Sequence, residues 1–123
     1  MRRLIPAGLL LATLALALPA AASARDSYCS PTGDYCTSVT PRGGGYLLRL
    51  ATFSFRGPVR VCVEPPRGSG TCKRFQIVKG KAGIYVSSVR WGRHFPDRGS
   101  GTYRVRWQKF GSTLGPALSF KRQ

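Results

Sequence analysis

Beyond residue 34, apolar and polar residues alternate in short runs that glycine and proline separate at fairly regular intervals. In TYRVRW, for example, Tyr103, Val105 and Trp107 alternate with two arginines. Successive side chains of a strand point to opposite faces of a sheet, so this alternation predicts strands with one buried face. The seven predicted strands are Tyr35–Val39, Tyr46–Phe55, Val59–Val63, Cys72–Val78, Ile84–Trp91, Thr102–Gln108 and Pro116–Lys121. No helical period is present, and the pattern predicts an all-β sandwich.

In two of these runs, the apolar residues switch from one face of the predicted strand to the other part-way along. In YLLRLATFSF, two leucines and two phenylalanines fall on opposite faces, so a bulge near Ala51 is predicted to bring both pairs into the core. In IYVSSVRW the apolar residues conflict in the same way, and a kink near Ser87 is predicted. The predicted core consists of Leu48, Leu50, Phe53, Phe55, Val59, Val61, Val63, Phe75, Tyr103, Val105, Trp107, Leu118 and Phe120.

The first residues, 1–24, have the pattern of a secretory signal peptide. Two arginines give a positive start, an apolar run follows, and Ala-Ser-Ala at 22–24 supplies small residues, so cleavage after Ala24 is predicted. The apolar run is shorter than the roughly 20 residues of a membrane-spanning helix, and an uncleaved anchor is the alternative. The protein is expected to be secreted, with a polar N-terminal arm over 25–34 and one β-sandwich domain over 35–123.

Four cysteines in a short exported chain predict two disulfides. In PVRVCVE, Cys62 lies on the face opposite the valines, and in CKRFQI, Cys72 lies on the face opposite the apolar residues. Cross-strand neighbours have about the Cβ separation that a disulfide needs, so Cys62–Cys72 is predicted. This pairing leaves Cys29–Cys36. Spacings of six and nine residues between cysteines, with a distant His94, do not match a zinc site.

The chain is strongly basic. It has 20 lysines and arginines, four acidic residues and a formal net charge of +16. Without the two arginines of the signal peptide, 18 basic residues against four acidic ones leave a charge of +14. A charge of this size favours solubility and attraction to polyanions, but it carries no information about fold. A generally basic surface is the alternative to a dedicated polyanion site.

The segment DRGSGTYRVRW resembles the tyrosine-corner segment of immunoglobulin-like domains, Asp-x-Gly-x-Tyr followed by a strand of inward-alternating residues. The gap from Asp97 to Tyr103 is two residues longer, and Val105 stands where antibody domains have a cysteine. The resemblance implies a seven-stranded immunoglobulin-like or fibronectin-like β-sandwich with two local disulfides. The chain is also similar to neocarzinostatin-type apoproteins, small exported sandwiches of actinobacteria. That family binds an apolar chromophore and is acidic, so the likeness implies architecture and not function.

Few residues are suited to catalysis. General acid–base chemistry needs a tuned pair, and this chain offers one histidine and four carboxylates. A small secreted nuclease would use Glu64, His94 and an arginine, but Glu64 ends a strand and His94 lies in the loop GRHFPDRGSG. The sequence has no G-x-S-x-G motif and no phosphate-binding loop in a strand–helix context. We therefore expect a non-enzymatic protein with no cofactor and no metal, with a nuclease as the enzyme alternative.

A binding surface is the remaining source of function. In an immunoglobulin-like order, four strands share one sheet, and their outward residues include Lys121 and a set of arginines. These arginines are Arg60, Arg74, Arg104 and Arg106. Like charges at facing positions repel, which favours a binding role, although arginine on a sheet also prevents aggregation. The loop GRHFPDRGSG adds Arg93 and Arg98. The predicted role is a binding or accessory module for an anionic polymer or acidic protein, and the alternative is a small-ligand carrier.

Overall fold

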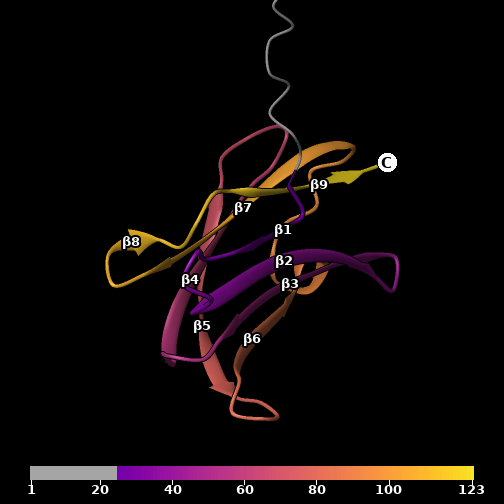
Figure 1. The fold of residues 1–123 in the computed structure, drawn as a ribbon. Coiled ribbons are helices and arrows are strands. Elements are labelled where there is room, and N and C mark those ends of the chain that lie inside the picture. Colours follow the sequence, from indigo (N-terminus) through magenta and orange to yellow (C-terminus); the bar gives the residue numbers. More distant parts are fainter. Residues whose placement is uncertain (1–24) are drawn as a thin grey trace, which may run out of the picture.

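The computed structural model describes residues 25–123, and the predicted signal peptide lies outside the described residues. Strands make up most of the described chain and helix is almost absent, so the predicted all-β fold is confirmed (Figure 1). The strands are β1 (Ser27–Cys29), β2 (Tyr35–Arg42), β3 (Gly45–Thr52), β4 (Gly57–Glu64), β5 (Thr71–Lys79), β6 (Tyr85–Arg90), β7 (Gly101–Lys109), β8 (Ser112–Thr113) and β9 (Leu118–Arg122). One helical turn, α1 (Trp91–His94), follows β6. Within this range no helix has the length and apolar character needed to cross a membrane.

The strands form one continuous, strongly curled antiparallel sheet (Figure 1). Its order is β1-β2-β3-β6-β5-β4-β7-β8, and β9 also pairs with β7. β5 and β6 are joined only near their ends, through Val78 opposite Val86 and Lys79 opposite Tyr85. The sheet therefore divides into a β1-β2-β3-β6 half and a β5-β4-β7 half that also carries β8 and β9, and the two halves enclose a shared apolar core.

All seven predicted strands are present, with ends shifted by a few residues. The structure adds two short strands that the alternation does not indicate. β1 pairs with β2, and β8 forms a hairpin with β7. Segments of two or three residues contain too few positions to show a period of two. The N-terminal stretch is also tied to β9, because the carbonyl oxygen of Arg25 accepts a hydrogen bond of 2.7 Å from the Ser119 N–H.

Most of the predicted core is confirmed. The buried members are Leu48, Leu50, Val59, Val61, Val63, Tyr103, Val105, Trp107, Leu118 and Phe120. Phe55 and Phe75 are partly buried and pack against this core. Trp91 closes one end of it, because its ring contacts Tyr103 of β7 and Phe120 of β9 at centroid distances of 5.0 and 5.2 Å.

The prediction for Phe53 is wrong, because this side chain is 60% exposed. β3 pairs with β2 and β6 in an unbroken register up to Thr52, so the strand contains no bulge. The buried Thr52 takes the inward position, and its hydroxyl accepts hydrogen bonds from the N–H groups of Ser54 and Phe55. The chain turns at this point. Phe55 reaches the edge of the core from the turn, and Phe53 points to solvent.

The kink predicted near Ser87 is also wrong. β6 pairs with β3 in an unbroken register, and Ser87 and Val89 are both buried on its inner face. Trp91 continues this face into α1. Ile84 precedes the strand, so its apolar character belongs to a turn and does not mark an inward position. The inner face of β6 therefore carries a serine where the sequence indicated a change of face.

Both predicted disulfides are confirmed. Cys29–Cys36 joins β1 to β2, and Cys62–Cys72 joins β4 to β5. In each bond the two cysteines are directly opposed, and their Cα atoms are 4.0 Å apart. Cys62 is buried although it lies on the outer face, with Cys72 and Arg106 as its two cross-strand neighbours. Shared parity on adjacent strands was sufficient to identify this pair.

Candidate functional site

The four strands that the sequence places in one sheet are neighbours in the order β5-β4-β7-β9. Alternate residues of each strand point away from the core, and the register aligns these outward positions across the sheet. The arginines that they carry define one surface, which we call the arginine face. Its members are Arg60, Arg74, Arg104 and Arg106.

Arg60 occupies the centre of one row of the arginine face. Its cross-strand partner on β5 is Arg74, and its partner on β7 is Gln108. Both arginines are exposed, and neither takes part in an ion pair among residues 25–123. Like charges at opposed positions destabilise a sheet, so this row gains an electrostatic benefit when an anion binds to it.

A second row carries the acidic residue of this face, Glu64. Glu64 lies opposite Arg104, and its Oε1 atom is 3.5 Å from Nη2 of Arg106. The side chains of this ion pair are 41% and 48% exposed, so water screens their attraction strongly. One carboxylate therefore offsets part of the charge of two arginines here, while Arg60 and Arg74 have no such neighbour.

A groove runs beside the Arg60–Arg74 row, and the β7–β8 hairpin forms its wall. Its lining includes Arg60, Arg74, Gln108, Phe110, Ser112 and Thr113. Phe110 is 77% exposed at the tip of the hairpin. Phe110 and Gly111 have φ values of 54° and 73°, the geometry of a two-residue hairpin turn in which an aromatic residue is uncommon.

The hairpin is held against the sheet by Lys109, which the sequence did not single out. Lys109 is buried, and its Nζ atom donates a hydrogen bond of 2.6 Å to the carbonyl oxygen of Pro58 on β4. The same ammonium group lies 4.8 Å from the centroid of the Phe110 ring. Lys109 therefore positions the groove wall. The residues of this wall were missed because the sequence presents FGSTLG only as a connector.

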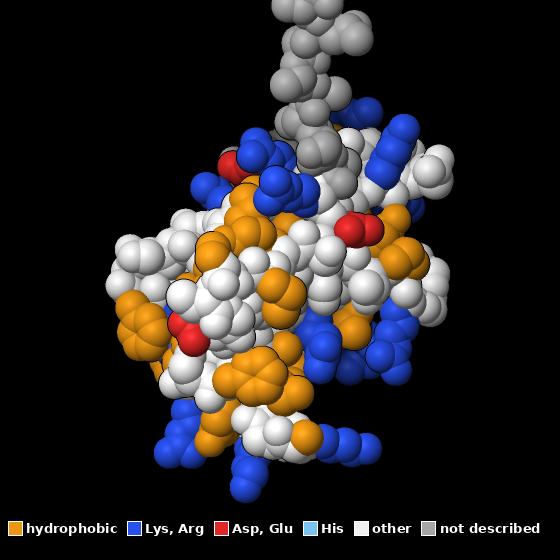
Figure 2. Space-filling model, in the orientation of Figure 1, with side chains coloured by type: hydrophobic (Ala, Val, Ile, Leu, Met, Phe, Trp, Pro, Cys, Tyr) orange, Lys and Arg blue, Asp and Glu red, His pale blue; other side chains and the backbone are white. Residues whose placement is uncertain are grey.

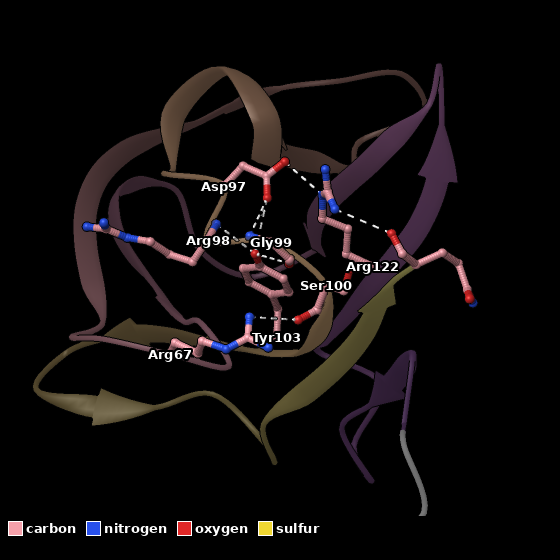
Figure 3. A network of polar contacts seen from close by, with 8 residues as sticks. Arg67, Asp97, Arg98, Gly99, Ser100, Tyr103 and Arg122 are labelled. Carbon is pink, nitrogen blue, oxygen red and sulfur yellow. Dashed lines mark hydrogen bonds and ion pairs between the residues drawn. The ribbon is translucent and has the colours of Figure 1, made fainter.

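The loop arginines do not join the arginine face. Arg93 is exposed on α1, which follows β6 in the other half of the sheet. Arg98 donates its backbone N–H to the hydroxyl oxygen of Tyr103 over 2.8 Å, and its side chain points away from this network (Figure 3). Neither predicted loop residue therefore occupies an outward strand position of the arginine face.

The network around Tyr103 fixes the loop before β7 (Figure 3). The Tyr103 hydroxyl donates to the carbonyl oxygen of Gly99 over 2.8 Å. Asp97 accepts hydrogen bonds from the Gly99 N–H over 2.9 Å and from Nε of Arg122 over 2.7 Å. The Gly99 N–H and then the Arg122 charge lower the pKa of the Asp97 carboxyl below its ordinary value. These partners identify Asp97 as a structural carboxylate.

The structure does not bring His94 and Glu64 together. The His94 ring packs nearly perpendicular to the ring of Phe75, a residue of β5, at a centroid distance of 5.1 Å. Glu64 lies on the outer face of β4, where it pairs with Arg106. Within residues 25–123, no group of three or more His, Cys, Asp or Glu side chains is arranged to hold a metal ion.

Basic side chains are spread over much of the visible surface, and acidic ones are few (Figure 2). The charge is therefore not confined to one face, and a specific site has to be recognised by convergence of side chains and not by charge alone. The arginine face meets this requirement through its register, and its groove adds polar and aromatic groups beside two of the arginines.

Comparisons with known proteins do not assign this chain to a family. No protein-family model matches the sequence, and no curated protein matches it. Among solved structures, the chain is similar to one titled "Crystal structure of Br derivative BhCBM56", with 18% sequence identity and a TM-score of 0.46. The superposition covers 79% of this chain and 99% of that one. A TM-score at this level is too low to carry an argument about function.

Proposed function

We propose that this protein is a secreted, non-enzymatic binding module whose arginine face binds an anionic polymer. The observation that carries the proposal is the direct opposition of Arg60 and Arg74 beside a groove, with no carboxylate paired to either. Two disulfides, which persist in oxidising compartments, support a role outside the cell.

The geometry of the face favours an extended ligand over a single small ion. Neighbouring strands are about 4.8 Å apart, and alternate residues of one strand about 6.6 Å apart, so the guanidinium groups extend over three successive outward rows. A polymer with repeating negative charges can contact several of them at once. Arginine suits this role because its planar group makes paired hydrogen bonds to carboxylate, sulfate or phosphate oxygens.

The groove beside the face would hold part of such a chain. Gln108, Ser112 and Thr113 can donate hydrogen bonds to hydroxyl or ester oxygens, and exposed Phe110 offers an apolar surface. An acidic polysaccharide or a phosphopolymer has the corresponding groups. We infer that the polymer lies across β4 and β5 at Arg60 and Arg74 and continues along the β7–β8 hairpin.

We further propose that seven of the strands form an immunoglobulin-like core. The pairings β2-β3-β6 and β5-β4-β7-β9 support this architecture, because they give two half-sheets over one core. The hydroxyl of Tyr103 bonds to the backbone of Gly99 four residues earlier, as a tyrosine corner does. β1 and β8 are then short additions at the margins of this core.

The test is the salt dependence of binding to two labelled polymers, a heparin oligosaccharide and polyphosphate. For wild type, the logarithm of the binding constant should fall steeply with the logarithm of salt concentration, because bound counterions are released. The Arg60→Gln/Arg74→Gln variant should bind more weakly, and its slope should flatten by about two units, because two arginines no longer neutralise charges of the polymer. The polymer that binds more tightly identifies the preferred acidic group.

A matched control separates the face from diffuse charge. Lys79→Gln/Lys81→Gln also removes two positive charges, but at exposed positions at the end of β5 and in the turn that follows it, off the arginine face. This control should change affinity far less than Arg60→Gln/Arg74→Gln. Equal losses in the two variants would show that overall charge, and not the arginine face, attracts the polymer.

A hollow between β5 and β6 favours a second candidate function, the small-ligand carrier. It is lined by apolar side chains that include Phe75, Val78 and Val86, and by Ser87, whose buried hydroxyl has no hydrogen-bond partner in the described chain. An apolar fluorescent dye should then bind saturably. Val78→Lys should abolish this binding without unfolding the protein, because Val78 is 59% exposed. Unchanged dye binding in this variant would exclude the hollow as the carrier site.

A further inference from the structure

A second group of arginines lies on the other half of the sheet, away from the arginine face. Arg42, Arg90 and Arg93 line one hollow together with Tyr46 and three glycines. The same three arginines also line an adjoining hollow beside His94. We call this cluster of Arg42, Arg90 and Arg93 the arginine pocket. Of its members, the sequence indicated only Arg93.

The fold brings these residues together from three segments. Arg42 ends β2, opposite Gly45 across the β2–β3 turn. Arg90 ends β6, opposite Leu47 of β3, so Arg42 and Arg90 come from the same end of this half-sheet. Arg93 follows on α1. Basic side chains gather near the β2–β3 hairpin in the space-filling view (Figures 1 and 2).

The elements that carry the pocket are anchored in the core. α1 begins at Trp91, which is 4% exposed and packs on Tyr103 and Phe120. The Phe95 N–H closes the helical turn with a hydrogen bond of 2.9 Å to the Trp91 carbonyl oxygen. Tyr46, at the start of β3, stacks on Phe120 at a centroid distance of 4.2 Å. The backbone of the pocket is therefore held in place before any ligand binds.

No Asp or Glu of the described residues lines either hollow of the arginine pocket. The ion pairs within residues 25–123 join Glu64 to Arg106 and Asp97 to Arg122, and neither includes an arginine of the pocket. Arg122 lines a neighbouring hollow with Arg42 and Tyr46, but its partner Asp97 lines neither hollow. Asp34 bonds to Thr32 in the N-terminal turn. Three guanidinium groups around one hollow repel one another, and a bound anion removes this repulsion.

The hollow is open enough for more than a bare ion. Its volume is about 320 Å³, which falls in the range of small-molecule sites. Gly43, Gly45 and Gly92 contribute no side chains to fill it. A Cβ atom built on Gly92 meets no other atom within 4 Å, so the fold leaves space there that a side chain could occupy.

We propose that the arginine pocket binds a phosphate or sulfate ester group carried by a ring-sized molecule, such as a phosphorylated or sulfated sugar unit. The guanidinium forks of Arg42, Arg90 and Arg93 surround the anionic group and donate paired hydrogen bonds to its oxygens. The remaining space beside Tyr46 takes the ring that carries the ester. This site uses none of the residues of the arginine face and does not depend on the function proposed for it.

The test is a calorimetric or NMR titration with glucose 6-phosphate, glucose 6-sulfate and unmodified glucose at constant ionic strength. Saturable binding of at least one ester, with none for glucose, is expected, and the tighter ester identifies the natural acid group. Arg90→Gln/Arg93→Gln should weaken binding of the ester at least ten-fold. Both positions are exposed, so the variant should fold normally, which circular dichroism checks. Failure of both esters to bind the wild-type protein overturns the proposal.

Two further variants make the assignment specific. Gly92→Glu places a carboxylate beside the three arginines where the fold has room, and it should block the ester as effectively as removal of two arginines. Arg60→Gln/Arg74→Gln removes an equal amount of positive charge, but from the arginine face. It should leave ester binding unchanged, while binding of the anionic polymer falls. Equal weakening by Arg60→Gln/Arg74→Gln and Arg90→Gln/Arg93→Gln would overturn the pocket in favour of diffuse charge.

Discussion

Arg60 and Arg74 are direct cross-strand partners on β4 and β5, and both side chains are exposed. Two like charges in this position weaken the sheet, because they lie at the closest spacing that two strands allow. Neither arginine takes part in the ion pairs of the described residues. Stability and anion binding should therefore respond in opposite directions when one of the two charges is reversed.

Arg74→Glu should raise the free energy of unfolding by roughly 0.2–1 kcal/mol, because an opposite-charge pair replaces a repulsive one. The same change should weaken binding to anionic polymers. Urea denaturation and polymer titration measure the two effects. Gln76→Glu is the control, since it adds negative charge at the next outward position of β5, opposite Pro58. A decrease in stability that only Arg74→Glu shows would contradict the repulsion argument.

Tyr103→Phe should lower the free energy of unfolding by about 1–3 kcal/mol, because it leaves the Gly99 carbonyl and the Arg98 N–H without their partner. The ring itself stays buried, so the decrease in stability measures the loss of the hydrogen bonds made by the hydroxyl group. Tyr46→Phe is the matched control, since its hydroxyl makes a single exposed hydrogen bond of 2.7 Å to the Lys121 carbonyl. Thermal unfolding should show the larger decrease for Tyr103→Phe, and equal decreases would refute a special role for the corner.

Asp97→Asn should flatten the acid limb of the stability curve. The folded chain holds the pKa of Asp97 below 3.8, its ordinary value, chiefly through the Gly99 N–H and also through Arg122. Between the folded and unfolded pKa values the unfolded state binds more protons, so stability rises with pH. The contribution is complete above about pH 4 and is lost as pH falls through the folded pKa.

The measurement is the free energy of unfolding between about pH 2 and about pH 6 at constant ionic strength, because carboxylates titrate within this range. Asp26→Asn, at an exposed position near the N-terminal end of the described chain, serves as the control. An Asp97→Asn variant with the acid dependence of wild type would show that the Gly99 and Arg122 interactions do not stabilise the charged carboxylate in solution.

Trp107→Ala should be among the most damaging single changes, because Trp107 is fully buried in the centre of β7. Truncation of a buried aromatic costs roughly 3–5 kcal/mol through reduced apolar burial and the cavity that remains. Phe53→Ala removes a similar ring from an exposed position and should change stability by less than about 0.5 kcal/mol. Denaturant unfolding compares the two, and similar decreases would mean that Phe53 is buried in solution.

The sequence by itself determined the strands and the disulfides, because both depend on local rules. A period of two assigns each residue of a strand to one face, so Val59, Val61 and Val63 could be placed inside without knowing their neighbours. The same parity put Cys62 and Cys72 on one face of consecutive strands, and a short connector made them neighbours. The inward face of β7 followed from TYRVRW alone.

Only the tertiary structure decided where strands end and which distant residues meet. Phe53 continues an apolar pattern, but β3 stops at Thr52 because its pairing with β2 and β6 ends there. Arg42 and Arg90 are far apart in the chain, and they share a pocket because β3 pairs with both β2 and β6. Strand order and register are long-range properties, and alternation within one segment contains no information about either.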